Sequence, residues 1–159
     1  MDLREALLIG HILGVVAMGF GSGAGLIAML TAGSSPDLPT IHRVARIGYN
    51  GGRVTAFSAV VVFIFGTWLV IEGDIYDFSQ AWISAAYALW FVAMGLGGGV
   101  MARHEGKLAT DAEAAIGRGE SSNAAVLAAY NSSTTKLVGS VLLLMYPVFM
   151  YLMVSKPGL

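Results

Sequence analysis

The sequence contains no cysteine and few charged residues. Of its 159 residues, 12% are charged and 56% are hydrophobic, and the formal net charge is −1. Soluble domains carry roughly 25% charged residues. Without cysteine, the chain can form no disulfide, thiolate metal centre or cysteine nucleophile. A net charge near zero provides no basic field to attract nucleic acid. The composition therefore excludes a nucleic-acid-binding protein and an ordinary cytosolic enzyme, and it is typical of a membrane protein.

Four long apolar stretches divide the chain. They cover residues 6–32, 54–71, 78–102 and 137–155. Each has about 18 residues or more, which is the length that a helix needs to cross a bilayer. Membrane-spanning segments must be helices or closed barrels, and barrel strands would be short and alternating. The sequence therefore predicts an all-α membrane protein, a single domain over residues 1–159 that forms an antiparallel bundle of four transmembrane helices.

The basic residues predict the orientation of the bundle. The first and third connections are flanked by seven of them: Arg43, Arg46, Arg53, Arg103, Lys107, Arg118 and Lys136. The opposite side has two, Arg4 and Lys156, and the connection 72–77 has three acids and no base. Because basic residues favour the cytoplasmic side, we expect the first and third connections in the cytoplasm and both termini outside.

Short helices are expected in both cytoplasmic connections. In the first connection, Ile41–Ile47 is expected to form a helix that ends at the glycine-rich stretch 48–52, before the second span. In the third, Thr110–Glu113 fits a capping box that opens an alanine-rich helix. That helix is expected to end near Gly117, and a further helical stretch is expected to start at residues 121–123.

Glycines recur on one face of the first span and at the end of the third. Small residues four apart let helices approach closely in lipid. The residues expected to pack in this way are Gly10, Gly14, Gly21 and Gly25 in the first span, and Gly95 and Gly98 in the third. Three partners remain open for these faces: another helix of the chain, a flat cofactor, or a different subunit.

His11 is the one imidazole within any predicted span. It lies about five residues inside the first helix, roughly 7–8 Å deep at 1.5 Å per residue. Ionisable residues inside a membrane usually mark function. His11 is therefore a candidate ligand of a metal or cofactor, and Gly14 and Met18 on the same helix are candidates to line that cofactor. The alternative is a neutral histidine that hydrogen-bonds to a neighbouring helix or a lipid headgroup.

The choice of cofactor is limited by what can reach the level of His11. No second histidine is expected there, so a two-histidine haem within one chain is not predicted. A haem held by a single histidine or by histidine and methionine remains possible, as does a histidine–methionine copper site in which Met150 is the second ligand. No acidic residue lies in any span, and no nucleophile motif occurs, which favours a protein that is not an enzyme.

Three short segments carry a resemblance to a known group of proteins. They are Leu7–Gly14 with its early histidine, Phe65–Val70 with its glycine and tryptophan, and Met153–Gly158 with its Lys–Pro pair. They resemble small bacterial four-helix integral membrane proteins of an uncharacterised domain family. Those proteins are similar in turn to the copper-resistance D group and to the membrane-type protoporphyrinogen oxidase of haem synthesis. The resemblance implies a bacterial inner-membrane protein and a b-type haem on His11 as axial ligand.

Two classes of function follow. The preferred one is a non-catalytic subunit or assembly factor of a larger membrane complex, expected to be a redox complex, that contacts lipid and other subunits or further copies of itself. The other is a membrane redox protein that binds haem, or a protein that handles copper, through His11.

Overall fold

The computed structural model describes residues 2–73 and 75–158, and throughout these residues the regular structure is helical. Its elements are α1 (Leu3–Ala32), α2 (Leu38–Glu72), α3 (Ala81–Met94), the π-helical segment η1 (Gly95–Met101), α4 (Ala102–Gly117), α5 (Ala124–Tyr130) and α6 (Ser133–Ser155). Four of the resulting rods are long and apolar enough to cross a membrane. The predicted all-helical fold with four membrane-spanning segments is confirmed at this level. Asp74, one of the acids of the second connection, lies outside the described residues.

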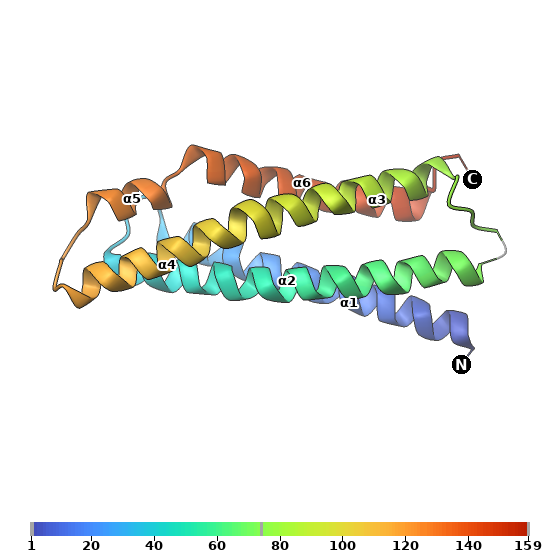
Figure 1. Ribbon diagram of the computed structural model, residues 1–159, viewed down its shortest axis with the longest axis horizontal. Coiled ribbons are helices and arrows are strands. Elements are labelled where there is room, and N and C mark those ends of the chain that lie inside the picture. Colours follow the sequence, from blue (N-terminus) through green and yellow to red (C-terminus); the bar gives the residue numbers. More distant parts are fainter. Residues whose placement is uncertain (1, 74, 159) are drawn as a thin grey trace.

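The four rods lie lengthwise beside one another, as Figure 1 shows. Helices α3, η1 and α4 follow one another without a break and form one rod. The chain turns back after each rod, so both termini lie at one end of the molecule and α5 lies at the other (Figure 1). We call these the terminal end and the α5 end.

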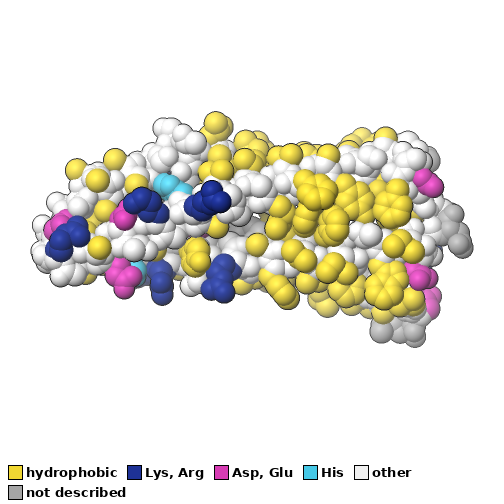
Figure 2. Space-filling view, in the orientation of Figure 1, with side chains coloured by type: hydrophobic (Ala, Val, Ile, Leu, Met, Phe, Trp, Pro, Cys, Tyr) yellow, Lys and Arg dark blue, Asp and Glu magenta, His cyan; other side chains and the backbone are white. Residues whose placement is uncertain are grey.

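Charge and apolar surface are separated along the molecule. In the view of Figure 2, lysine and arginine side chains gather over the half that contains α4 and α5, and hydrophobic side chains cover much of the other half. The rod Ala81–Gly117 has 37 residues, or about 55 Å at 1.5 Å per residue. The hydrocarbon core of a bilayer is about 30 Å thick. The α5 end of this rod must therefore extend well beyond the core of a membrane.

The expected break after the first cytoplasmic helix is wrong. Helix α2 runs without interruption from Leu38 to Glu72, through Gly48, Gly51 and Gly52. Glycine lowers helix propensity by about 1 kcal/mol relative to alanine, but packing against neighbouring elements overrides propensity. Here α1 lies directly against Gly51, and a side chain of α4 lies against Gly48. These contacts keep the glycine-rich turn helical.

The expected capping box at Thr110–Glu113 is also wrong. Thr110 lies in the interior of α4, which is already helical from Ala102 onward. Its hydroxyl donates to the Gly106 carbonyl four residues earlier, at 3.0 Å, as threonine side chains do within helices. The predictions that this helix ends near Gly117 and that a further helix follows agree with α4 and α5.

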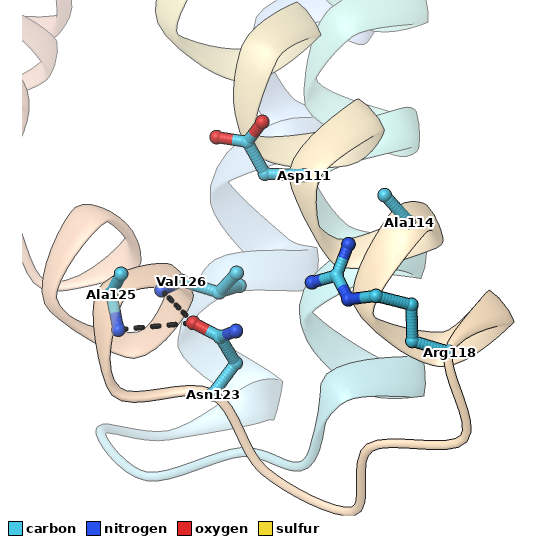
Figure 3. Close-up of a pocket in the computed structure, with 6 residues that line it drawn as sticks. All are labelled: Asp111, Ala114, Arg118, Asn123, Ala125 and Val126. Carbon is cyan, nitrogen blue, oxygen red and sulfur yellow. Dashed lines mark hydrogen bonds between the residues drawn. The ribbon is translucent and has the colours of Figure 1, made fainter.

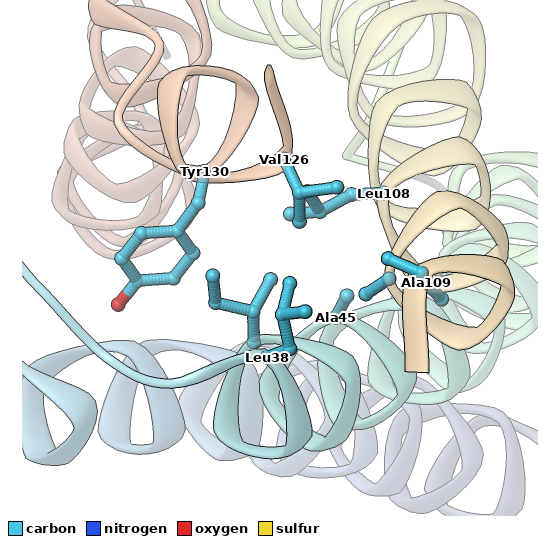
Figure 4. Packing of buried hydrophobic residues seen from close by; sticks show 9 residues of the cluster. Leu38, Ala45, Leu108, Ala109, Val126 and Tyr130 are labelled. Carbon is cyan, nitrogen blue, oxygen red and sulfur yellow. The ribbon is translucent and has the colours of Figure 1, made fainter. Parts of the chain in front are cut away.

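A tightly packed cluster joins α2, α4 and α5 at the α5 end, and Figure 4 shows it from close by. The buried members are Leu38, Ile41, Ala45, Leu108, Ala109, Ala112, Ala115, Val126 and Tyr130. The alanines let α2 and α4 approach closely. The Tyr130 hydroxyl donates to the Gly33 carbonyl at 2.9 Å, which ties α5 to the end of α1. We call this group the α5-end cluster.

A second cluster joins α2, α3 and α6 near the terminal end. Its buried members are Val70, Trp82, Ile83, Ala86 and Leu152. The Tyr76 ring meets the Trp82 ring edge-on, with centroids 5.7 Å apart. The Lys156 ammonium donates to the Tyr76 hydroxyl at 2.7 Å, so the last turn of the chain is fastened to the loop before α3.

The backbones of α1 and α2 approach each other very closely. A Cβ atom added at Gly21 would lie 2.6 Å from the Gly51 carbonyl oxygen, and one added at Gly51 would overlap the Gly21 carbonyl oxygen. Since backbone atoms cannot move aside as the end of a side chain can, these two positions require glycine. Elsewhere on α1, a Cβ at Gly23 would meet no described atom within 4 Å.

We predict that Gly51→Ala separates α1 from α2 and lowers the free energy of unfolding by about 1–3 kcal/mol, the usual cost of overpacking. The matched control is Gly23→Ala, which should be neutral or slightly stabilising because alanine favours the helix. Denaturant unfolding in mild detergent measures both. Equal effects of the two substitutions would contradict the close approach at Gly51.

Candidate functional site

The His11 side chain lies between α1 and α2. Its Nδ1 atom is 3.0 Å from the Val62 carbonyl oxygen. A Cβ at Gly66 would lie 2.9 Å from Cε1 of the same ring. A larger residue at position 66 would therefore push the imidazole away, and glycine there lets the ring lie flat against α2. His11 is half-buried in this position.

The hydrogen bond determines which nitrogen of a neutral His11 ring carries the proton. A carbonyl oxygen can only accept, so Nδ1 carries the proton and donates it to Val62. The neutral ring then has its lone pair on Nε2. This is the arrangement of metal-binding histidines, in which a carbonyl or carboxylate holds one nitrogen and the other binds the metal. Chemically, His11 is prepared to donate one lone pair to a cofactor.

His42 forms the same kind of bond elsewhere. Its Nδ1 atom lies 3.0 Å from the Ala109 carbonyl oxygen, beside the α5-end cluster. A histidine–carbonyl bond therefore also serves helix packing in this molecule. His11 differs in its surroundings, because it lies within an apolar span, where an imidazole without a task is costly. His11 and His42 thus form the same kind of hydrogen bond in different surroundings, and the effects of replacing each can be compared.

The other residues predicted for the His11 site are Gly14, Met18 and Met150. Gly14 is buried one turn further along α1, where a Cβ would lie 2.7 Å from a Val62 methyl group. Met18 uses its backbone, since its carbonyl oxygen accepts from Tyr146 and Thr55. Met150 has a side chain that is 65% exposed, and no described hydrogen bond connects it to His11. The structure thus places Gly14 beside the His11 partner Val62, and the cofactor-lining role of Gly14 and Met18 stays a prediction.

The predicted glycine contacts have unequal surroundings. A Cβ at Gly10 would lie 2.7 Å from the Phe65 ring, and one at Gly25 would lie 3.3 Å from the Gly48 Cα atom. With Gly14 and Gly21, these glycines all face α2. In contrast, a Cβ at Gly95 or Gly98 would meet no described atom within 4 Å. The packing of Gly95 and Gly98 against another helix, a cofactor or a different subunit remains a prediction.

A group of hydroxyls that sequence reasoning missed connects three helices. Ser22 Oγ lies 2.7 Å from the Tyr146 hydroxyl and 3.1 Å from Thr55 Oγ1. Tyr146 and Thr55 also donate to the Met18 carbonyl, at 3.2 and 3.3 Å. The signal in the sequence was three hydroxyl residues inside otherwise apolar spans. Such groups hydrogen-bond to one another across helices in a membrane. We call this group the hydroxyl cluster.

Aromatic side chains connect α2 to α3 on the terminal side of the hydroxyl cluster. The Phe63 ring lies 4.4 Å from the Trp90 ring and 5.2 Å from the Tyr87 ring, measured between centroids. The Trp90 indole donates to the Ala59 carbonyl at 3.0 Å, and the Tyr87 hydroxyl lies 2.7 Å from Thr67 Oγ1. Large side chains therefore span the distance between these two helices.

The hollow drawn in Figure 3 lies at the α5 end and has a volume of about 210 Å³. It is lined by Asp111, Ala114, Arg118, Asn123, Ala125 and Val126. The Asn123 side chain is turned to the start of α5, where it accepts from the backbone of Ala125 and Val126. Asn123 thus caps a helix of seven residues, and the other two charged groups of the hollow, Asp111 and Arg118, pair with Lys107 and Glu120.

Metal binding by several side chains finds no support in the described part of the chain. Within residues 2–73 and 75–158, no group of three or more histidine and carboxylate side chains is positioned to hold a metal ion. A cofactor that needs one protein ligand fits the donor set better than a metal ion that needs three or four.

These features define an integral membrane protein with four membrane-spanning helical rods. The sequence profile of the family described as "Predicted integral membrane protein (DUF2269)" matches residues 5–157, so the chain belongs to this family. No curated protein and no solved structure matches the chain. The resemblance to the copper-resistance D group and to the oxidase stays a prediction.

We predict that Tyr146→Phe weakens the hydroxyl cluster, because it removes two hydrogen bonds from the contact between α1 and α6. Hydrogen bonds between membrane helices contribute about 0.6 kcal/mol on average and up to about 1.7 kcal/mol. The matched control is Tyr151→Phe, on the same helix, whose side chain is 59% exposed. Unfolding in mild detergent should show a loss for Tyr146→Phe alone, and equal stabilities would argue against the cluster.

Proposed function

We propose that this protein is a non-catalytic subunit of a membrane redox complex, and that His11 is the ligand through which it holds a b-type haem. In this proposal the four rods form an antiparallel bundle in a bacterial inner membrane. The first and third connections, with most of the basic residues, face the cytoplasm, and both termini face outside.

One observation carries the proposal: the His11 ring donates from Nδ1 to the Val62 carbonyl and keeps the Nε2 lone pair for a ligand. The described residues place no carboxylate and no nucleophile in a hydrogen bond with His11. This favours a ligand over an acid–base catalyst.

Haem is supported better than copper by the residues present. A haem would need only one histidine of this chain as a protein ligand, and His11 would be that residue. A copper site would need further ligands, and Met150, the candidate for that role, is exposed on α6 without a described contact to His11. Copper therefore has less support from the donor set.

Each residue around His11 would have a definite task. The Val62 carbonyl would fix the tautomer and the orientation of the ring. Gly66 would let the ring approach α2, and Gly14 would keep α1 close to Val62. A haem bound there would supply one-electron transfer, and the surrounding apolar side chains would exclude water.

We predict that His11→Ala abolishes haem binding. The chain is expressed with a haem precursor, purified in mild detergent, and its visible spectrum and haem content per chain are measured. The wild-type protein should show the intense Soret absorbance of a porphyrin, and His11→Ala should lose it, because the ligand atom Nε2 is gone.

The matched control is His42→Ala, which removes a histidine with the same carbonyl bond at the α5 end and should keep the absorbance. Size-exclusion chromatography establishes that both variants remain folded. A colourless wild-type protein, or an equal loss in both variants, would overturn the haem role.

A second candidate function is docking to another membrane protein without any cofactor. It is favoured by the glycines of η1, since Cβ atoms at Gly95, Gly97, Gly98 and Gly99 would meet no described atom within 4 Å. Close helix approach at glycine faces is the usual basis of helix association in lipid. In this case η1 would receive a helix of a partner subunit or of a second copy.

We predict that Gly98→Leu lowers the fraction of the protein found in complexes, because the added side chain fills the space that a partner helix would occupy. The matched control is Gly19→Leu, at a position on α1 that is equally open among the described residues. Native mass spectrometry in detergent measures the assembly state. If the two variants assemble as the wild type does, η1 is not a docking face.

A further inference from the structure

Glu105 lies near the start of α4, where this helix packs against α2. A Cβ added at Gly48 would lie 2.6 Å from Oε1 and 2.8 Å from Cδ of Glu105, and one at Gly52 would lie 3.9 Å from Oε2. The carboxyl group therefore rests on a glycine surface of α2. A Cβ added at Gly25 of α1 would lie 3.3 Å from the Gly48 Cα atom, so α1 also packs against this part of α2.

No cation neutralises this carboxyl in the described residues. The salt bridges formed there are Lys107–Asp111 and Arg118–Glu120, and neither includes Glu105. The titratable groups within about two turns of this level are His42, Arg43, Arg46, Tyr49 and Arg53 on α2, and Arg103, His104, Lys107 and Asp111 on α4. On the other elements, α1 and η1 provide none in this half of the molecule, and Lys136 of α6 donates to Asn131.

Glu105 is three residues past the predicted end of the third span, where the charged half of the molecule begins. Burial raises the pKa of its carboxyl to about 7, because the charged form is poorly solvated there. In the unfolded chain the same group titrates near its ordinary value of 4.5. The folded state therefore binds the proton more tightly. Its stability falls as the pH rises from about 4.5 through about 7, and changes no further above that range.

The contact of Glu105 with α2 lies between a tightly packed region and a region where the helices separate. Towards the α5 end, the α5-end cluster clamps α4 to α2. In the other direction follows η1, a π-helical segment with four glycines, and beyond it α3 leans away from α2 (Figure 1). Short π-helical segments are rare and are frequent at functional sites, and the glycines of η1 permit backbone conformations that other residues do not. The segment η1 can therefore act as a hinge directly beside Glu105.

We propose that Glu105 is a proton-binding latch at the cytoplasmic mouth of the bundle. The protonated carboxyl lies on Gly48 and Gly52 and holds η1 against α2. The ionised carboxylate turns to water, and η1 opens away from α2 at its glycine hinge. The ligand of this site is a proton from the cytoplasm, and the response is a change in the distance between η1 and α2. This proposal does not depend on haem at His11.

Spin labels on η1 and α2 test the latch. The chain has no native cysteine, so labels can be placed at Val54→Cys and Val100→Cys, whose native side chains are exposed on α2 and η1. Pulsed electron paramagnetic resonance of the full chain in lipid nanodiscs measures their distance between about pH 5 and about pH 9. The distance should lengthen with a midpoint near pH 7. An unchanged distance over this range would overturn the proposal.

Three variants of the spin-labelled chain test whether Glu105 is the group whose titration changes the distance. Glu105→Gln, a neutral side chain of the same shape, should lose the pH response and stay closed. Gly48→Ala should shift the midpoint to lower pH, because its Cβ displaces the flexible end of Glu105 towards water. Glu113→Gln, an exposed carboxyl on the same helix, should respond as the wild type does. A wild-type response in Glu105→Gln would assign the titration to another group and refute the latch.

Discussion

The structure depends on the close approach of α1 and α2, where Gly21 and Gly51 place one backbone against the other. Lipid offers no hydrophobic driving force between helices, so van der Waals contact and interhelical hydrogen bonds must hold them. Glycine allows the close van der Waals contact, and this short separation in turn allows the interhelical hydrogen bonds. Only at this short separation can Thr55 of α2 reach the Met18 carbonyl and His11 reach the Val62 carbonyl. The two helices form the unit against which the remaining rods are arranged.

Polar groups within the spans are satisfied mostly by backbone carbonyls. His11, Trp90 and Tyr146 all donate to carbonyl oxygens of a neighbouring helix, at 3.0 to 3.2 Å. Those carbonyls already belong to helices, so each polar side chain shares an acceptor and needs no charged partner. In a medium without water, this arrangement avoids both unsatisfied donors and the desolvation of an ion pair. It also fixes the rotation of each helix about its axis.

The number and place of the membrane segments could be predicted because they depend on apolar length alone, and the stretches 6–32 and 137–155 lie within helices α1 and α6. The predicted helix end at positions 48–52 and the predicted helix start at Thr110 are wrong, because local helix propensity does not include the contacts that neighbouring helices make. For the site, His11 was identified as the one imidazole in a span. Its carbonyl partner Val62 and the half-buried position of Glu105 depend on contacts between distant segments, and no spacing in the sequence reveals them.

Helix α2 runs without a break through both the charged half and the apolar half of the molecule. Gly48, which receives Glu105, and Val62, which receives His11, are fourteen residues apart on it, or about 21 Å. A bend or rotation of this helix displaces both positions together. Thermodynamic linkage then requires reciprocity: any ligand near Val62 that alters the affinity of the Glu105 carboxyl for hydrogen ions has its own affinity altered by the same factor. One continuous helix thus couples the binding free energies at two remote positions.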